Sequence, residues 1–162
     1  MIALRPATEE DFAPMFAVHE EAIRDYVVQT WGHWDPVWQS NYFREHFNCS
    51  RCRIVLVNSQ AAGYFQVIRE ADHFFIEFII LAPAFHRRGI GTQLIQDLLA
   101  EASRAKLPVG LQVLKVSPAR RLYERLGFEV FGETDAHFLM EAQPANGPAP
   151  MGTNGDREDL CT

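Results

Sequence analysis

The feature that most constrains this sequence is a hydrophobic strand that leads through a short glycine- and arginine-rich loop directly into an amphipathic helix. The segment, residues 79–92, reads Ile-Ile-Leu-Ala-Pro-Ala-Phe-His-Arg-Arg-Gly-Ile-Gly-Thr. The first backbone N–H groups of a helix lack intrahelical partners, and the positive end of the helix dipole adds to their attraction for anions. Gly89 and Gly91 permit close approach of a bulky phosphate, and Arg87 and Arg88 add positive charge. The segment predicts either an anion cradle or a tight turn with solvated arginines.

A second segment further along the chain accompanies this loop. Residues 117–128 read Ser-Pro-Ala-Arg-Arg-Leu-Tyr-Glu-Arg-Leu-Gly-Phe, which predicts a helix that begins after Ser117-Pro118 and ends at Gly127. Together the two segments strongly resemble the GNAT acetyltransferase family. That family's signature is Gln or Arg, two residues, Gly, one residue, Gly or Ala, followed later by an Asn-containing helix with a Tyr four residues before a Gly-Phe pair. The resemblance covers roughly residues 1–142.

The resemblance implies a fold of the α/β class, with α+β character. This is the GNAT acyl-CoA N-acyltransferase fold, a mixed, mostly antiparallel central sheet of about seven strands with helices on both faces. In it, the strand at 73–81 is expected to splay from the strand at 109–114 and leave a wedge for the cofactor arm. Periodicity and turn residues predict further strands at 53–57, 63–69, 128–131 and 137–140, and helices that begin after Thr8, at Pro36 and near Gly89.

Composition suggests how the chain is divided. Residues 1–142 are expected to form one acetyltransferase domain, because the chain has the size of a single domain and a normal apolar content. From Gln143 onward Pro, Gly, Asn, Thr and Asp replace large apolar residues, so residues 143–162 are expected to be a disordered tail. Residues 28–34, with two tryptophans and a glycine, are expected to connect the first two helices and either to cap the core or to line a pocket.

The resemblance also implies a cofactor, acetyl-CoA as acyl donor, and the residues that bind it. The pyrophosphate loop of the family falls on residues 87–92, and the strand end that pairs with the pantetheine arm falls on residues 79–81. Two positions depart from the signature: His86 replaces Gln or Arg, and Ser117 replaces the Asn that usually begins the later helix. The expected cofactor-binding residues are Ile79, Ile80, Leu81, Arg87, Arg88, Gly89, Ile90, Gly91, Thr92, Ser117 and Tyr123.

Two residues are candidates for the catalytic chemistry. Tyr123 falls where the family commonly has a tyrosine that protonates the departing thiolate, although it could instead be a core aromatic residue. An alkylammonium has a pKa of roughly 10, so the acceptor needs a base or a water chain to lose its proton. Glu77 interrupts an apolar strand, where an unpaired carboxylate is costly to bury, and some family members use an acidic residue there. Glu77 is either that base or a carboxylate that is ion-paired or faces solvent.

The acceptor site is expected near the first two helices, because these helices and their connection form one wall of it in the family. Trp31, Trp34, Asp35 and Gln39 are the candidate residues there. The Trp-Gly connection and the segment 133–137 are similar to a bacterial subgroup of the family. His137 either faces the acceptor or is a structural histidine.

The charge and the cysteine content indicate which partners, and which cellular location, are expected. The net charge of −6 gives no positive field for a nucleic acid, and residues Cys49, Cys52 and Cys161 do not complete a metal site. No signal peptide or membrane-length apolar run is present, so a soluble, cytoplasmic protein is expected. A homodimer is compatible with the family.

The function expected from these residues is direct transfer of an acetyl group from acetyl-CoA to a primary amine through a tetrahedral intermediate. Neither motif contains a cysteine, which disfavours a covalent acyl-enzyme. A small-molecule amine is the favoured acceptor. A protein N-terminus or lysine is the alternative, as is a non-catalytic acyl-CoA-binding protein of the same fold.

Overall fold

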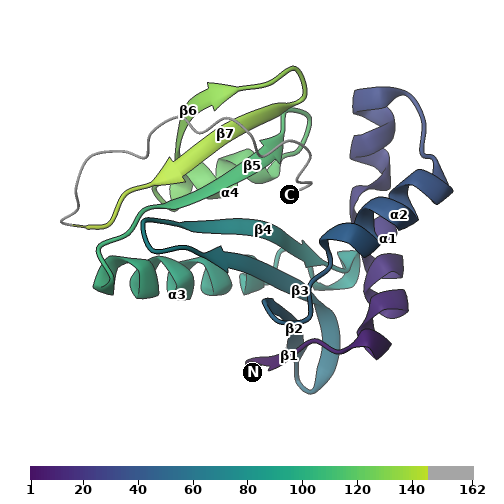
Figure 1. Ribbon diagram of the computed structural model, residues 1–162, viewed down its shortest axis with the longest axis horizontal. Helices are drawn as coiled ribbons and strands as arrows, with labels where there is room; N and C mark the ends of the chain where they lie inside the picture. Colours follow the sequence, from purple (N-terminus) through teal and green to yellow (C-terminus); the bar gives the residue numbers. More distant parts are fainter. Residues whose placement is uncertain (146–162) are drawn as a thin grey trace. The chain divides into compact units, whose positions relative to one another are not determined.

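The computed structural model describes residues 1–145 as a mixed α/β structure with a seven-stranded, mostly antiparallel open sheet and four α-helices (Figure 1). The strand order is β1-β2-β3-β4-β5-β7-β6, and this confirms the predicted fold class. In chain order the elements are β1 (Ile2–Pro6), α1 (Phe12–Trp31), α2 (Pro36–His46), β2 (Cys52–Val57), β3 (Gln60–Arg69), β4 (Phe74–Leu81), α3 (Ile90–Arg104), β5 (Val109–Leu114), α4 (Ala119–Arg125), β6 (Glu129–Glu133) and β7 (His137–Ala142).

The chain divides into two compact units. The first comprises Met1–Gln66 and Phe78–Ile90, and the second comprises, among the described residues, Val67–Glu77 and residues 91–145. The division falls within β3 and β4, so each unit has a part of both strands. Of the predicted tail, residues 146–162 lie outside the described part of the chain.

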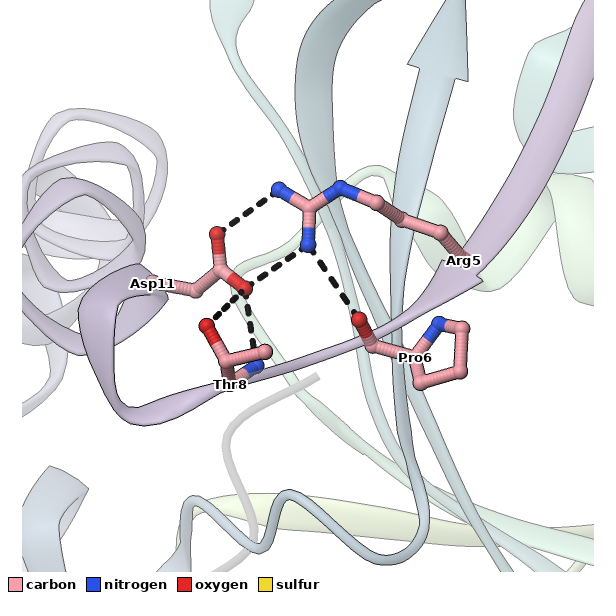
Figure 2. A network of polar contacts seen from close by, with 4 residues as sticks. All are labelled: Arg5, Pro6, Thr8 and Asp11. Atoms are coloured by element: carbon pink, nitrogen blue, oxygen red, sulfur yellow. Dashed lines mark hydrogen bonds and ion pairs between the residues drawn. The ribbon is translucent and has the colours of Figure 1, made fainter.

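In the first unit, a network of polar side chains fixes the entry to α1 (Figure 2). The Arg5 guanidinium donates to both carboxylate oxygens of Asp11 at 2.8 Å, and the Thr8 backbone N–H donates to the same carboxylate at 2.8 Å. The hydrogen bonds from Arg5 lower the pKa of Asp11, although burial of the carboxylate opposes them. This confirms the predicted helix start after Thr8, with a capping box at Thr8 and Asp11.

The connection between α1 and α2 is shorter than predicted. Helix α1 continues through Val28 to Trp31 and ends where Gly32 takes the left-handed conformation, with φ of 87°. The predicted loop at 28–34 is therefore wrong in its first half, because helical packing of Val27 outweighs the low helix propensity of the β-branched pair Val27-Val28. Helix α2 begins as predicted, with the Asp35 side chain accepting hydrogen bonds from two backbone N–H groups of the first turn.

The core of the first unit is an aromatic cluster. Phe43 of α2, Tyr64 of β3 and Phe78 of β4 are each fully buried. The Phe43 ring lies 5.7 Å from Tyr64 and 6.4 Å from Phe78, in tilted or edge-on arrangements that favour aromatic pairs. The cluster packs α2 against the two strands.

Strands β3 and β4 approach each other closely at Gly63. A Cβ atom on Gly63 would lie 2.8 Å from the Leu81 Cα and 2.9 Å from the Ile80 carbonyl carbon, and closer still to the Ile80 carbonyl oxygen. Only glycine fits this position, so Gly63 fixes where the end of β4 lies relative to β3.

The second unit has its own apolar core, to which α3, β5 and β7 contribute. The buried stripe of α3 in this unit consists of Leu94, Ile95, Leu98 and Ala102. All of β5 is buried, and it pairs antiparallel with β7 from Val109↔Ala142 to Leu114↔His137.

Strands β4 and β5 pair in parallel over a short register. The pairs run from Phe74↔Val109 to Ile76↔Leu111, all within the second unit. Strand β4 itself continues to Leu81.

None of the helices within residues 1–145 combines the length and the apolar character that crossing a membrane requires. In the same part of the chain, no three or more His, Cys, Asp or Glu side chains gather in a way that could hold a metal ion.

Candidate active site

The predicted anion-binding loop joins the end of β4 to the start of α3. A short 3-10 turn, Pro83–Phe85, follows the strand, and its Phe85 side chain is buried. Arg87 and Gly89 both take the left-handed conformation, with φ of 60° and 75°. Arg87, Arg88 and Gly89 are exposed, and the Arg88 guanidinium lies over the Phe85 ring at 5.3 Å. The loop thus presents its backbone and two cationic side chains to solvent.

The two glycines of this loop leave the backbone open to a large anion. A Cβ atom on Gly89 would meet no heavy atom within 4 Å, and one on Gly91 would meet only the Leu122 Cδ2, at 3.9 Å. Gly91 and Thr92 belong to the first turn of α3, whose leading N–H groups have no partner within the helix. The residues present therefore suit a phosphate group at the start of α3.

The strand end expected to pair with the cofactor arm has alternating burial. Ile80 is buried, whereas Ile79 and Leu81 are half-buried. Residues 79–90 of the predicted cofactor set belong to the first unit, and Gly91, Thr92, Ser117 and Tyr123 belong to the second.

Tyr123 is the buried residue of the short helix α4. Its side chain is 3% exposed and its ring meets the Phe128 ring edge-on at 5.9 Å. The apolar residues Ala119, Leu122 and Leu126, in and just after this helix, are only half-buried. Burial raises the pKa of the Tyr123 hydroxyl above its ordinary value. The hydroxyl is therefore protonated at neutral pH and can act as a proton donor.

Ser117 precedes α4 and stabilises its start. The Ser117 hydroxyl oxygen accepts a hydrogen bond of 3.2 Å from the Ala119 backbone N–H. The side chain thus satisfies one N–H group at the beginning of the helix, as the sequence predicted for a capping residue.

Glu77 is a buried carboxylate in β4. Its side chain is 2% exposed, between the buried neighbours Ile76 and Phe78. A solvent-facing position, one of the two alternatives open from the sequence, is therefore wrong. A buried carboxylate requires polar partners, which leaves the alternatives of an ion pair and a base.

The four acceptor candidates on α1, α2 and their connection belong to the first unit. Trp31 is 48% exposed, and the half-buried Trp34 donates from its indole nitrogen to Glu20 Oε2 at 3.1 Å. Asp35 is engaged as the cap of α2. Gln39 is only 5% exposed, and its Oε1 atom has no hydrogen-bond partner among the described residues. An unpartnered buried acceptor of this kind can receive an N–H group.

His137 belongs to the second unit, at the start of β7. Its side chain is 4% exposed, and its backbone N–H donates to the Thr134 hydroxyl at 3.0 Å. It is not in the same unit as the other acceptor candidates.

The structure also contains a buried polar pair that the sequence did not reveal as such. His19 of α1 and Tyr64 of β3 are fully buried, and the His19 Nδ1 lies 2.6 Å from the Tyr64 hydroxyl oxygen. The other imidazole nitrogen, Nε2, has no partner among the described residues. His19 lies on the buried face of its helix, with Met15, Ile23 and Val27. A histidine at a core position is the signal for a hydrogen-bonded partner, but the partner lies 45 positions away in the chain.

Burial lowers the pKa of His19 from its ordinary 6.5 to about 3. The His19 imidazole therefore binds a proton more readily in the unfolded chain than in the folded one. The contribution of the neutral imidazole to the free energy of unfolding is present above pH 6.5 and is lost as the pH falls toward 3. Between pH 7 and pH 5 we expect the wild type to lose about 2 kcal/mol more free energy of unfolding than His19→Gln, at about 1.4 kcal/mol per pH unit. Urea denaturation at both pH values measures the difference. Identical losses in both proteins would exclude His19 as the source.

Comparison with known proteins identifies the family. A sequence model of the acetyltransferase (GNAT) family matches residues 15–128, and the chain therefore belongs to that family. The match includes both signature segments and confirms the resemblance derived from them. No curated protein matches the sequence.

Solved structures share the fold at low sequence identity. PaiA N-acetyltransferase from Thermoplasma acidophilum, solved in complex with coenzyme A, is similar with a TM-score of 0.70 and 17% identity over 88% of this chain and 99% of that chain. The ribosomal-protein-S18-alanine N-acetyltransferase from Escherichia coli gives a TM-score of 0.67 and 18% identity over 93% and 97%. The structure described as histone acetyltransferase HPA2 and related acetyltransferase, from Corynebacterium glutamicum, has a TM-score of 0.67 and 19% identity. The match covers 89% of this chain and 97% of that chain. These likenesses support the fold.

Proposed function

We propose that this protein transfers an acetyl group from acetyl-CoA directly to a primary amine of a small molecule, and that residues 1–142 are its catalytic domain. The observation that carries the proposal is the loop before α3, where Gly89 is left-handed and open and Arg87 and Arg88 are exposed. Membership of the GNAT family and the coenzyme A bound to the similar PaiA enzyme support the same cofactor.

The cofactor is proposed to bind through backbone groups of the loop and of the strand end. The backbone N–H groups of residues 87–92 bind the pyrophosphate, and the two arginines add charge to the same anion. The backbone of Ile79, Ile80 and Leu81 pairs with the pantetheine arm, and Ser117 orients the start of α4. When bound, acetyl-CoA supplies an acetyl group that is already activated as a thioester.

Two residues are proposed to transfer protons during the reaction, one as acceptor and one as donor. Glu77, a buried carboxylate, receives the proton that the ammonium group of the acceptor must lose, directly or through water. Tyr123 donates the proton that the departing sulfur needs: its hydroxyl is protonated at neutral pH, although burial, by raising its pKa, makes it a weaker acid. Charge that develops during transfer is then neutralised by groups already in place.

The acceptor is proposed to bind beside α1 and α2. The unpartnered Gln39 Oε1 can accept an N–H group of the amine, and Trp31 and Trp34 offer apolar and cation–π contacts. The negative net charge of the chain also favours a cationic substrate.

Replacing Tyr123 with phenylalanine tests the proton donor. Because Phe keeps the ring packing against Phe128 and removes only the hydroxyl, CoA affinity is expected to stay within about twofold. The kcat for acetyl transfer is expected to fall about 100-fold, the lower range for loss of a general acid. Steady-state kinetics and calorimetry measure the two quantities.

A matched control removes a different phenol. Tyr26→Phe changes a half-buried residue of α1 and is expected to leave kcat unchanged. Equal kcat values for the wild type and Tyr123→Phe would remove Tyr123 from the mechanism.

A panel of amines tests the acceptor class. Small primary amines, peptides with a free N-terminus and lysine peptides are each incubated with enzyme and acetyl-CoA, and CoA release is measured. Release with small amines supports the proposal, whereas release with peptides alone would replace it with a protein acetyltransferase. Binding of acetyl-CoA without release for any amine would favour a non-catalytic acyl-CoA-binding protein.

A further inference from the structure

We propose that His86 is a positioning residue for the cofactor: its imidazole holds the anion-binding loop to the end of β4. The proposal rests on the proposed acetyl-CoA function. The His86 Nε2 atom lies 2.7 Å from the Leu81 carbonyl oxygen. Because a carbonyl oxygen only accepts hydrogen bonds, Nε2 carries the proton and donates it. The contact therefore fixes the tautomer of the imidazole as well as its direction.

The loop around His86 needs such a contact to keep its shape. Arg87, a residue with a Cβ atom, is held at a φ of 60°, and Gly89 is held at 75°. A non-glycine residue in this conformation persists only where its surroundings hold it. The buried Phe85 precedes His86, and the Arg88 guanidinium lies over the Phe85 ring. His86 adds the hydrogen bond that ties this stretch back to the strand.

The acceptor of this hydrogen bond lies at the strand end that is proposed to pair with the pantetheine arm. Leu81 is the last residue of β4. A carbonyl oxygen has two lone pairs, so the bond from His86 leaves one for another donor. His86 thus couples the two parts of the chain proposed to bind the cofactor, the strand end and the loop, and sets the position of one relative to the other. His86, Leu81 and residues 87–90 of the loop lie in the first unit.

This role accounts for a histidine at a position where the family signature has Gln or Arg. All three side chains carry an N–H donor at the end of a side chain that extends beyond Cγ. A histidine with the proton on Nε2 provides the same donor. A histidine at this position therefore retains an N–H donor, as Gln or Arg would supply.

Calorimetric titration of the full chain with CoA tests the proposal through three variants. His86→Ala removes the donor and is expected to weaken CoA binding about fivefold to tenfold, the effect of one hydrogen bond. His86→Gln restores a donor and is expected to bind CoA within about twofold of the wild type. His33→Ala, which removes an exposed imidazole from the α1–α2 connection, is the matched control and is expected to bind CoA like the wild type.

A second measurement separates positioning from general stability. Nitrogen chemical shifts of the wild-type imidazole, recorded without CoA, are expected to show the Nε2-protonated tautomer for His86. CoA affinity of His86→Ala equal to that of the wild type, or a proton on Nδ1, would overturn the proposal. Failure of His86→Gln to recover affinity would also overturn it. Absence of CoA binding by the wild type itself would instead contradict the proposed function.

Discussion

Replacing Gly89 with glutamate is expected to weaken CoA binding about 1,000-fold, a loss of about 4 kcal/mol. Gly89 takes a φ of 75°, a conformation that residues with a Cβ atom rarely adopt, and the space beside it is open. A glutamate would fill that space with a carboxylate next to the proposed phosphate site. Lost charge-assisted hydrogen bonds, at about 1.5–3 kcal/mol each, and like-charge repulsion both act against the cofactor. Calorimetric titration with CoA measures the loss.

Gly32→Glu is the matched control for this experiment. Gly32 is also left-handed, with φ of 87°, and a Cβ atom there would also meet nothing within 4 Å. The control therefore imposes the same backbone strain and the same added charge at the end of α1, away from the loop in sequence. It is expected to bind CoA like the wild type. Equal affinities of Gly89→Glu and the control would show that the loop does not hold the phosphates.

Replacing Gly63 with alanine is expected to lower the free energy of unfolding by about 3 kcal/mol or more. The added Cβ would lie within 3 Å of the Ile80 and Leu81 backbone, which cannot rotate away as a side chain could. Strand β3 must then separate from β4 at the strand end that is proposed to bind the cofactor. Because domains are stable by only about 5–15 kcal/mol, this is a large share of the total. Urea denaturation measures the change.

Gly132→Ala provides the comparison for Gly63. Gly132 also lies in a strand, β6, but a Cβ atom there would meet only side-chain atoms of Leu139, the nearest at 3.4 Å. The side chain can adjust, so the expected change is within about 1 kcal/mol. If both alanine variants lost the same stability, the close approach at Gly63 would not control the packing of β3 on β4.

Much of the fold could be predicted because its elements have local signals. The proline at the start of α2, the polar cap at Asp35 and the left-handed glycine at Gly127 each act within one turn of the chain, and the structure has all three. The extent of α1 could not be predicted in the same way. Its last turn combines the β-branched Val28 with Trp31, and packing of the preceding turn decides that it stays helical.

In the candidate site, too, the features with local sequence signals could be predicted and those that depend on packing could not. The loop at 87–92 and Tyr123 were found because spacing within short segments carries the signal. The hydrogen bond between His86 and Leu81, the close approach at Gly63 and the pairing of His19 with Tyr64 depend on how strands and helices pack. Residue types alone do not contain that information, since the partners belong to different elements or face each other only in the folded chain.

We propose that the loop before α3 makes this protein an acetyl-CoA-binding enzyme. Calorimetric titration of the purified wild type with acetyl-CoA, and then with CoA, tests it most directly. We expect micromolar-range binding of both ligands, close to one equivalent, because the anion-binding groups contact the part that the two share. Absence of binding by either ligand would contradict the account, and the substitutions at His86 and Ser117 would then have disabled the site.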